Sequence, residues 1–202
     1  MNTRFLVLGT LVTAVALYAW QTVSNAALPW HTATMREFTN NDAVVNATRA
    51  SAPRNGVYYS KQGIFAAVRF TSDLADQSSM KYMGPMLGRQ AAIDLAAALL
   101  LTLIVLRLPA GPALRAGVTL AATALAFGGI KELSDANWYG FSASYALVNT
   151  IDLTLQGLIA GLVLGALLNR MRRSEARADG AAAVRAEGGL PAGRVGAPAR
   201  PR

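Results

Sequence analysis

The chain has 202 residues, of which 53% are hydrophobic and only 15% are charged, a balance typical of membrane proteins. It contains no Cys and a single His, which excludes disulfides, Cys/His zinc sites, iron–sulfur clusters and thiol catalysis. No metal and no cofactor is predicted. The net charge of +8 comes from Arg beside apolar blocks and in the tail, without a nucleic-acid-binding motif, so a nucleic-acid partner is not predicted.

The first apolar block covers residues 4–23 and approaches the length that spans a bilayer core. Arg4 precedes the apolar run, which predicts a helix that starts in the cytoplasm and leads outward. A cleavable signal peptide is the competing interpretation, because Ser24 and Ala26 suit cleavage after Ala26. We favour an uncleaved helix, since the run is long for a signal peptide and Trp20 suits the membrane interface.

Residues 24–88 are mostly polar and predict a small α+β extracytoplasmic segment. Cap-forming residues indicate two short helices that begin near Thr32 and Asn41. The β-rich runs VYYS and IFAAVRF, separated by three residues, predict a hairpin. Because a lone hairpin is marginal in water, it needs to pack on the short helices, the membrane surface or a partner.

Three further apolar blocks predict three more membrane-spanning helices, at 90–108, 113–133 and 145–168. The PAGP turn after the first of them lies between Arg107 and Arg115, which indicates the cytoplasmic side. The linker between the last two is rich in Trp, Tyr and Phe, which suit the outer membrane interface.

A basic tail at 169–202 follows the last span, and its NRMRRSEAR segment predicts that the C-terminus stays in the cytoplasm. From about Asp179 the Ala, Gly, Pro and Arg composition predicts disorder. The sequence therefore predicts an all-α integral membrane protein. Its four-transmembrane-helix bundle would be multi-pass in the bacterial inner membrane, with both termini inside and residues 24–88 outside.

Ionisable residues within apolar spans are functional candidates, because hydrocarbon does not solvate charge. Asp94 and Asp152 stand out in this respect. Alternation of helix direction places both near the outer ends of their helices, in one polar layer with Arg89, Gln90, Lys131, Glu132, Asn149 and Gln156. On the last helix, the three-and-four spacing of Asn149, Asp152 and Gln156 forms one polar stripe.

This polar layer has two interpretations. It could bind or pass a proton, a cation or a polar ligand. The alternative, which we favour because carboxylates near the interface can reach water, is structural: Asp94 or Asp152 would pair with Lys131 or Arg89 and hold the helices in register.

Two other features are candidates for packing or binding. Gly157, Gly161 and Gly165 form a GxxxGxxxG face that allows close helix approach, and we favour packing within the chain over a homodimer interface. His31 lies just outside the first span, where a ligand, metal or proton could meet it. Since it has no companion ligands in the sequence, we favour an interfacial or hydrogen-bonded role.

The function is predicted only by elimination. No G-x-S-x-G, P-loop, HExxH or dinucleotide-binding motif is present in the sequence. The sequence favours a non-enzymatic accessory or assembly component that lies in the lipid bilayer and contacts an envelope partner or a second copy. A small transporter or ion- or proton-conducting subunit is the first alternative, although four helices without an internal repeat are few for a transporter. A membrane-embedded lipid-modifying enzyme is the second.

Overall fold

A computed structural model describes residues 3–69 and 80–188. The described part is mostly helical, and four of its helices are long and apolar enough to cross a membrane. These candidate spans are Thr3–Ala27, Met83–Arg107, Ala113–Tyr139 and Ala143–Val184. The predictions of four such helices and of a small hairpin are confirmed.

The N-terminal span consists of α1 (Thr3–Thr22) and a π-helical turn, η1 (Val23–Ala27). A 3-10 turn, η2 (Thr32–Thr34), replaces the first of the two short helices predicted from sequence. The second of them forms as α2 (Asn41–Ser51), whose N-cap is Asn40 and not Asn41. The Asn40 side chain accepts a hydrogen bond from the Ala43 backbone amide, which satisfies one of the free donors at the helix start.

The hairpin pairs β1 (Gly56–Tyr59) with β2 (Phe65–Val68) in antiparallel register, from Gly56 opposite Val68 to Tyr59 opposite Phe65. Its turn contains Gly63 at a φ of 89°, a conformation that glycine adopts without strain. We call α2 and the hairpin, residues 41–68, the module. The Phe65 ring stacks on Tyr139 with ring centroids 4.6 Å apart, so the module contacts the helical bundle.

The remaining candidate spans come from α4 onward. The elements are α4 (Met80–Arg107), α5 (Ala113–Ala124), a π-helical segment η3 (Leu125–Gly129), α6 (Ile130–Tyr139) and α7 (Ala143–Gly188). Since α5, η3 and α6 are contiguous, they form one long helix.

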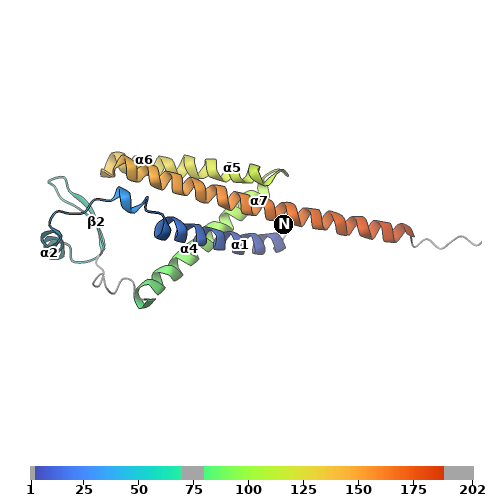
Figure 1. The fold of residues 1–202 in the computed structure, drawn as a ribbon, viewed down its shortest axis with the longest axis horizontal. Coiled ribbons are helices and arrows are strands. Elements are labelled where there is room, and N and C mark those ends of the chain that lie inside the picture. The colour runs from blue at the N-terminus through green and yellow to red at the C-terminus, as the bar shows by residue number, and fades with distance from the viewer. Residues whose placement is uncertain (1–2, 70–79, 189–202) are drawn as a thin grey trace, which may run out of the picture.

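In the bundle, α7 is the central helix (Figure 1). In the most apolar window of each span, 39% of the α7 residues are buried, compared with 22% in each of the other three. The α5–α6 helix packs on one side of α7, and α1 and α4 lie on the other. Phe5, Leu120 and Leu164 are among the fully buried core side chains.

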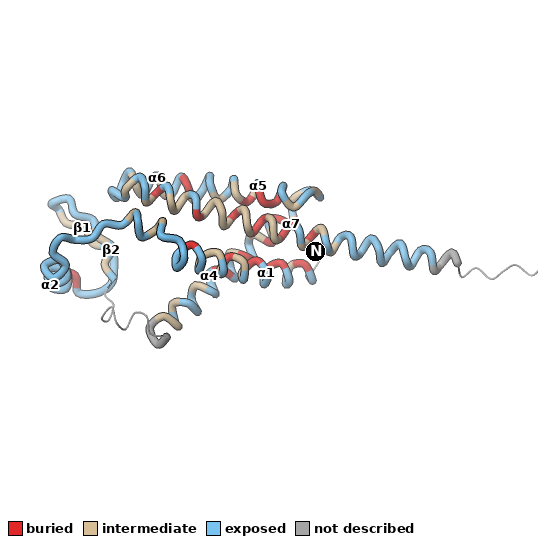
Figure 2. Tube along the Cα trace, viewed as in Figure 1, coloured by how far each residue is buried: buried red, intermediate tan, exposed pale blue. Residues whose placement is uncertain are grey.

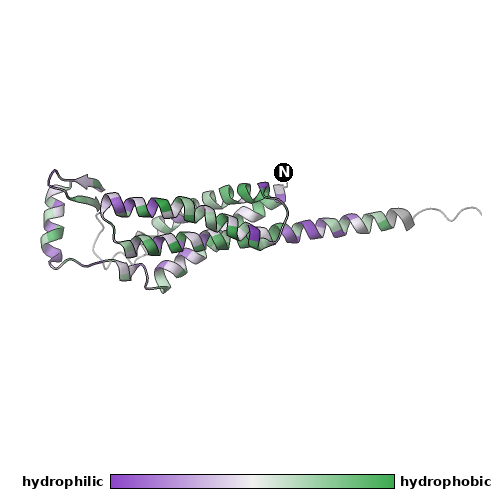
Figure 3. Ribbon diagram, turned by 90° about the horizontal axis from the view of Figure 1, so that it is seen from above, coloured by the Kyte–Doolittle hydropathy of each residue, from purple (hydrophilic) through white to green (hydrophobic). Residues whose placement is uncertain are grey.

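The module lies at one end of the bundle, and the turn between α4 and α5 lies at the other (Figure 1). We call these the module end and the arginine end, because Arg107, Arg115 and Arg170 lie at the second. Buried residues concentrate in the bundle, and the module is mostly exposed (Figure 2). Apolar residues line the bundle helices, whereas polar ones dominate α7 beyond it (Figure 3).

Three helix boundaries differ from those predicted. The third span continues past residue 133 to Tyr139, where Gly140 in the left-handed conformation ends it. The second begins at Met80, ahead of residue 90. The helix α7 continues to Gly188, although disorder is predicted from Asp179. Ala, the strongest helix former, is the commonest residue in this stretch, and a helix already running through the bundle needs no new nucleus.

Candidate functional site

Asp152 on α7 accepts hydrogen bonds from three neutral side chains. Its Oδ1 atom accepts from Trp20 Nε1 at 2.7 Å and from Ser24 Oγ at 2.8 Å. Its Oδ2 atom accepts from Gln156 Nε2, one turn further along α7, at 3.1 Å. The N-terminal span is therefore fixed to the central helix through a buried carboxylate.

Asp94 on α4 is only 3% exposed. Protein atoms, without any lipid, bury its side chain. Its Oδ1 atom accepts from Gln21 Nε2 and from Gln90 Nε2, both at 2.9 Å. Its Oδ2 atom is buried and has no hydrogen-bond partner among the described residues. Because buried polar atoms are nearly always paired, this oxygen calls for an explanation.

The two carboxylates belong to one network. The Gln21 amide that donates to Asp94 also lies 3.4 Å from Gln156 Oε1, and the Gln156 amide donates to Asp152. Three elements, α1, α4 and α7, thereby meet through side-chain hydrogen bonds near the module end. We call this set the Asp94–Asp152 cluster; it comprises Trp20, Gln21, Ser24, His31, Gln90, Asp94, Asp152 and Gln156.

The π-helical turn η1 places Ser24 in the centre of this cluster, fully buried. Ser24 Oγ donates to Asp152 and lies 3.1 Å from His31 Nε2. Since the hydroxyl has a single hydrogen, His31 Nε2 must be the donor in the second contact. The Trp30 indole donates to the Ser24 backbone oxygen at 3.0 Å, so the loop after η1 folds back over the cluster.

Ser24, His31 and Asp152 contain the residue types of a nucleophilic triad, but their geometry differs. In such a triad the carboxylate holds Nδ1 of the imidazole, and Nε2 accepts the serine proton. Here Nε2 faces both partners, at 3.1 Å from Ser24 Oγ and 3.6 Å from Asp152 Oδ2. The Ser24 hydroxyl donates its hydrogen bond to the Asp152 carboxylate and not to the imidazole, so this arrangement does not activate Ser24 as a nucleophile.

The polar layer predicted from sequence is divided in the structure. Lys131 Nζ pairs with Asp135 at 2.6 Å and with Glu132 at 3.6 Å, and Asn149 Nδ2 lies 3.4 Å from Glu132 Oε2. These residues form a separate group on α6 and α7, outside the Asp94–Asp152 cluster.

The predicted pairing of Asp94 or Asp152 with Lys131 or Arg89 is wrong. Lys131 finds carboxylates on its own helix, and the exposed Arg89 donates to the Pro85 backbone oxygen. Helix α4 tilts away from the bundle at its start (Figure 1). The next residue, Gln90, still reaches Asp94, whereas the Arg89 side chain is exposed and bonded to its own helix. Asn149 also lies outside the Asp94–Asp152 cluster. Of the predicted polar stripe, Asp152 and Gln156 belong to the cluster.

The glycine face of α7 packs against α5. A Cβ atom on Gly157 would lie 2.6 Å from the Leu120 backbone oxygen, and one on Gly165 would lie 2.8 Å from the Ala113 Cα atom. At Gly161 a Cβ would overlap the backbone of Ala116 and Gly117. Because α5 covers this face, a second copy would have to displace α5 to use it.

Sequence reasoning missed three members of the cluster, Trp20, Gln21 and Ser24. The sequence suggests an interfacial anchor at Trp20 and part of a cleavage site at Ser24, whereas Gln90 belongs to the predicted polar layer. A signal for the three exists, since Trp20, Gln21 and Ser24 follow a three-and-four spacing near the end of an apolar helix. Their partners, however, lie on helices far along the chain.

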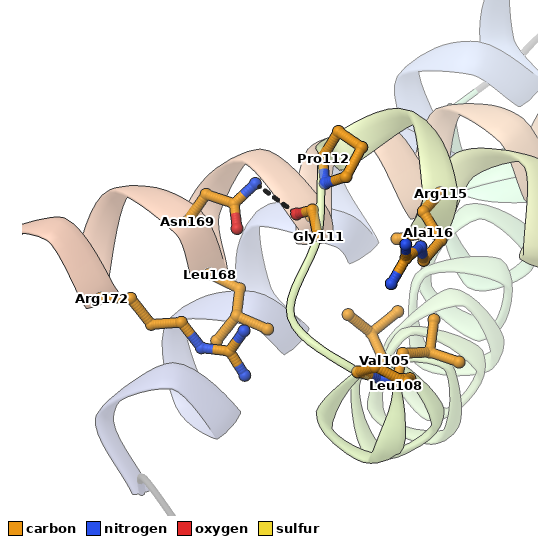
Figure 4. Close-up of a pocket in the computed structure, with 11 residues that line it drawn as sticks. Val105, Leu108, Gly111, Pro112, Arg115, Ala116, Leu168, Asn169 and Arg172 are labelled. Carbon is orange, nitrogen blue, oxygen red and sulfur yellow. Dashed lines mark hydrogen bonds between the residues drawn. The ribbon is translucent and has the colours of Figure 1, made fainter.

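The described residues contain no group of three or more His, Cys, Asp or Glu that could hold a metal ion. At the arginine end, the Asn169 amide donates to the Gly111 backbone oxygen at 3.0 Å and closes the turn onto α7 (Figure 4). The adjoining pocket, between Arg115 and Arg172, encloses about 20 Å³, room for roughly one water molecule.

These features define a helical bundle with four helices that could cross a membrane, an exposed module at one end and a buried polar cluster beside it. In comparisons with protein-family models, with curated proteins and with solved structures, nothing matches this chain.

Proposed function

We propose that this protein is a non-enzymatic accessory component of the bacterial inner membrane, which contacts an envelope protein through extracytoplasmic residues 28–69. The observation that carries the proposal is the apolar surface of this segment. Met35, Phe38, Val57, Tyr59 and Ile64 are all more than 60% exposed. Several large apolar side chains exposed on one short segment favour a protein partner that covers them.

The orientation follows from the distribution of arginine. Arg107 and Arg115 flank the α4–α5 turn, and Arg170, Arg172 and Arg173 follow the apolar part of α7. Basic residues beside spans remain in the cytoplasm, so the arginine end lies inside and the module outside. The outward apolar faces of the four spans then contact lipid.

The Asp94–Asp152 cluster supports an uncleaved N-terminal helix. Cleavage after Ala26 would remove Trp20, Gln21 and Ser24, which donate to the two buried carboxylates. Buried acceptors that lose their donors are costly. A lipid-modifying enzyme gains less support, because the Ser24 proton is held by Asp152 and not by His31.

The chemistry of the partner follows from the charge of the segment. Residues 28–69 contain five basic and two acidic residues, a net charge of +3 with His neutral. Within residues 3–69 and 80–188 the sheet consists of two strands, so each strand has an outer edge that an added strand could pair with. A groove of about 370 Å³ lies between α2 and the hairpin, lined by Tyr58 and Ile64 among others. We therefore infer an extended, acidic segment with apolar side chains as the occupant.

A photoreactive amino acid at Tyr59, which is 84% exposed, tests this proposal in intact cells. The expected result is one discrete adduct with a different protein, and the double charge reversal Arg54→Glu and Lys61→Glu should abolish it. The same photoreactive residue at Phe127, exposed on a candidate span, is the matched control and should give no such adduct.

Three outcomes would contradict the proposal. An adduct with the mass of two copies would assign the surface to a homo-oligomer. An adduct unaffected by the charge reversals would contradict an acidic partner. The absence of any adduct at Tyr59 would contradict a docking role for this surface.

A further inference from the structure

We propose that Asp94 is a proton-binding site, in which Oδ2 carries the proton while Oδ1 accepts hydrogen bonds from the amides of Gln21 and Gln90. Two observations point to it: the side chain is buried by the protein itself, and Oδ2 is inaccessible yet has no hydrogen-bond partner in the described part of the chain. This inference does not depend on the partner of the module.

Among the described residues, no Lys or Arg forms an ion pair with Asp94. From α1 it faces Gln21, and from its own helix Gln90. From α7, Gln156 and behind it Asp152 complete the set. Among the described residues, the carboxylate of Asp152 and the imidazole of His31 are the titratable groups of the cluster beside Asp94. Since an ionised carboxylate buried without a cation is costly, a proton on Oδ2 is the simplest way to remove the charge.

A metal ion fits this position poorly. Sodium or calcium requires several oxygen ligands around it, whereas the Asp94 carboxylate is approached by the nitrogen atoms of two amides. No group of three or more His, Cys, Asp or Glu side chains occurs among the described residues. One free oxygen suits a proton and is insufficient for a metal cation.

Asp152 provides an internal contrast. Both of its oxygens are occupied, Oδ1 by Trp20 and Ser24 and Oδ2 by Gln156, with His31 beside it at 3.6 Å. It therefore has no free oxygen for a proton. Of the two carboxylates in this network, Asp94 is the one with an oxygen that accepts no hydrogen bond. The two should therefore differ in proton binding.

A hydrophobic carbodiimide tests this difference, because it adds to protonated carboxyl groups in apolar surroundings. The full-length protein in liposomes is treated with dicyclohexylcarbodiimide, and the modified residues are located by peptide mass spectrometry. The expected result is an adduct on Asp94 and not on Asp152, with a yield that falls as the pH is raised from mildly acidic to mildly alkaline. Mapping the unsubstituted protein requires no variant to fold.

Variants sharpen the test. Asp94→Asn should lose the adduct, and Asp152→Asn should retain it. Gln21→Leu removes one of the two donors to Oδ1 and leaves Oδ2 without a change of contacts, so Asp94 should still be labelled.

The proposal is overturned if Asp94 is not labelled, if Asp152 is labelled in its place, or if the yield is independent of pH. Protection by sodium at constant pH, with choline replacing it in the control, would assign the site to a metal cation and also overturn the proton site. None of these results bears on the photocrosslink at Tyr59.

Discussion

The buried carboxylate of Asp152 is held by neutral donors. Trp20 and Ser24 reach it from the N-terminal span and Gln156 from its own helix. Hydrogen bonds to a charged acceptor are stronger than those between neutral groups, so each donor contributes to fixing α1 on α7. The pair of Trp20 and Asp152 has the shortest of these contacts, at 2.7 Å.

A double-mutant cycle on this pair is expected to reveal direct coupling. Trp20→Phe and Asp152→Asn should each lower the free energy of unfolding by about 1–3 kcal/mol, because each disturbs a buried, charge-assisted hydrogen bond. The double variant should lose less than the sum by at least about 0.5 kcal/mol. Circular dichroism during denaturation in mixed micelles measures all three. Trp138→Phe is the control, since Trp138 is 79% exposed, and additive losses would disprove the coupling.

At the scale of elements, two π-helical segments lie where the candidate spans contact α7. The turn η1 brings Ser24 onto Asp152, and η3 places Gly129 against Thr150 of α7. Such segments are frequent at functional sites. In this bundle the two π-helical segments lie toward the polar residues of the module end, whereas α5 and α7 pack through small residues within regular α-helix.

The contact between α5 and α7 is expected to tolerate no side chain at Gly161. Gly161→Ala should destabilise the protein by about 1–3 kcal/mol, because the added Cβ overlaps the backbone of α5. Gly180→Ala is the matched control on the same helix: nothing lies within 4 Å of a Cβ there, and replacing a helical Gly should stabilise by up to about 1 kcal/mol. Unfolding in mixed micelles compares them, and equal effects would contradict the α5–α7 packing.

At the scale of the whole molecule, the two ends of the bundle carry different kinds of polar residues. The arginine end carries the basic residues beside the α4–α5 turn and on α7, whereas the module end carries the module and the Asp94–Asp152 cluster. Because positive residues remain inside, this asymmetry determines the expected orientation.

Alkaline phosphatase fusions test that orientation, since the enzyme is active only outside the cytoplasm. Fusions after residue 60 or 140, at the module end, should be active. Fusions after residue 111 or 175, at the arginine end, should be inactive. Enzyme activity normalised to fusion level is the measurement, and a reversal at any of the four positions breaks the four-span topology.

Local features were predictable from the sequence. Four apolar runs are properties of contiguous residues, and so is the hairpin, in which two β-rich segments are joined by a short turn containing Gly63. The placement of Asp94 and Asp152 within apolar helices was also foreseeable. The extent of α7 was not, since composition near Asp179 suited a disordered tail and a helix equally.

The partners of the two carboxylates were decided only by tertiary structure. Sequence alone determined that Asp94 and Asp152 lie in apolar helices and require neutralising or hydrogen-bonding groups. Which groups reach them depends on helix order and tilt: Lys131 pairs one turn along its own helix with Asp135, whereas α1 lies between α4 and α7 and contributes Gln21 to one carboxylate and Trp20 and Ser24 to the other. Hydrogen bonds between side chains require proximity in space, and spacing along the chain does not encode which helices become neighbours.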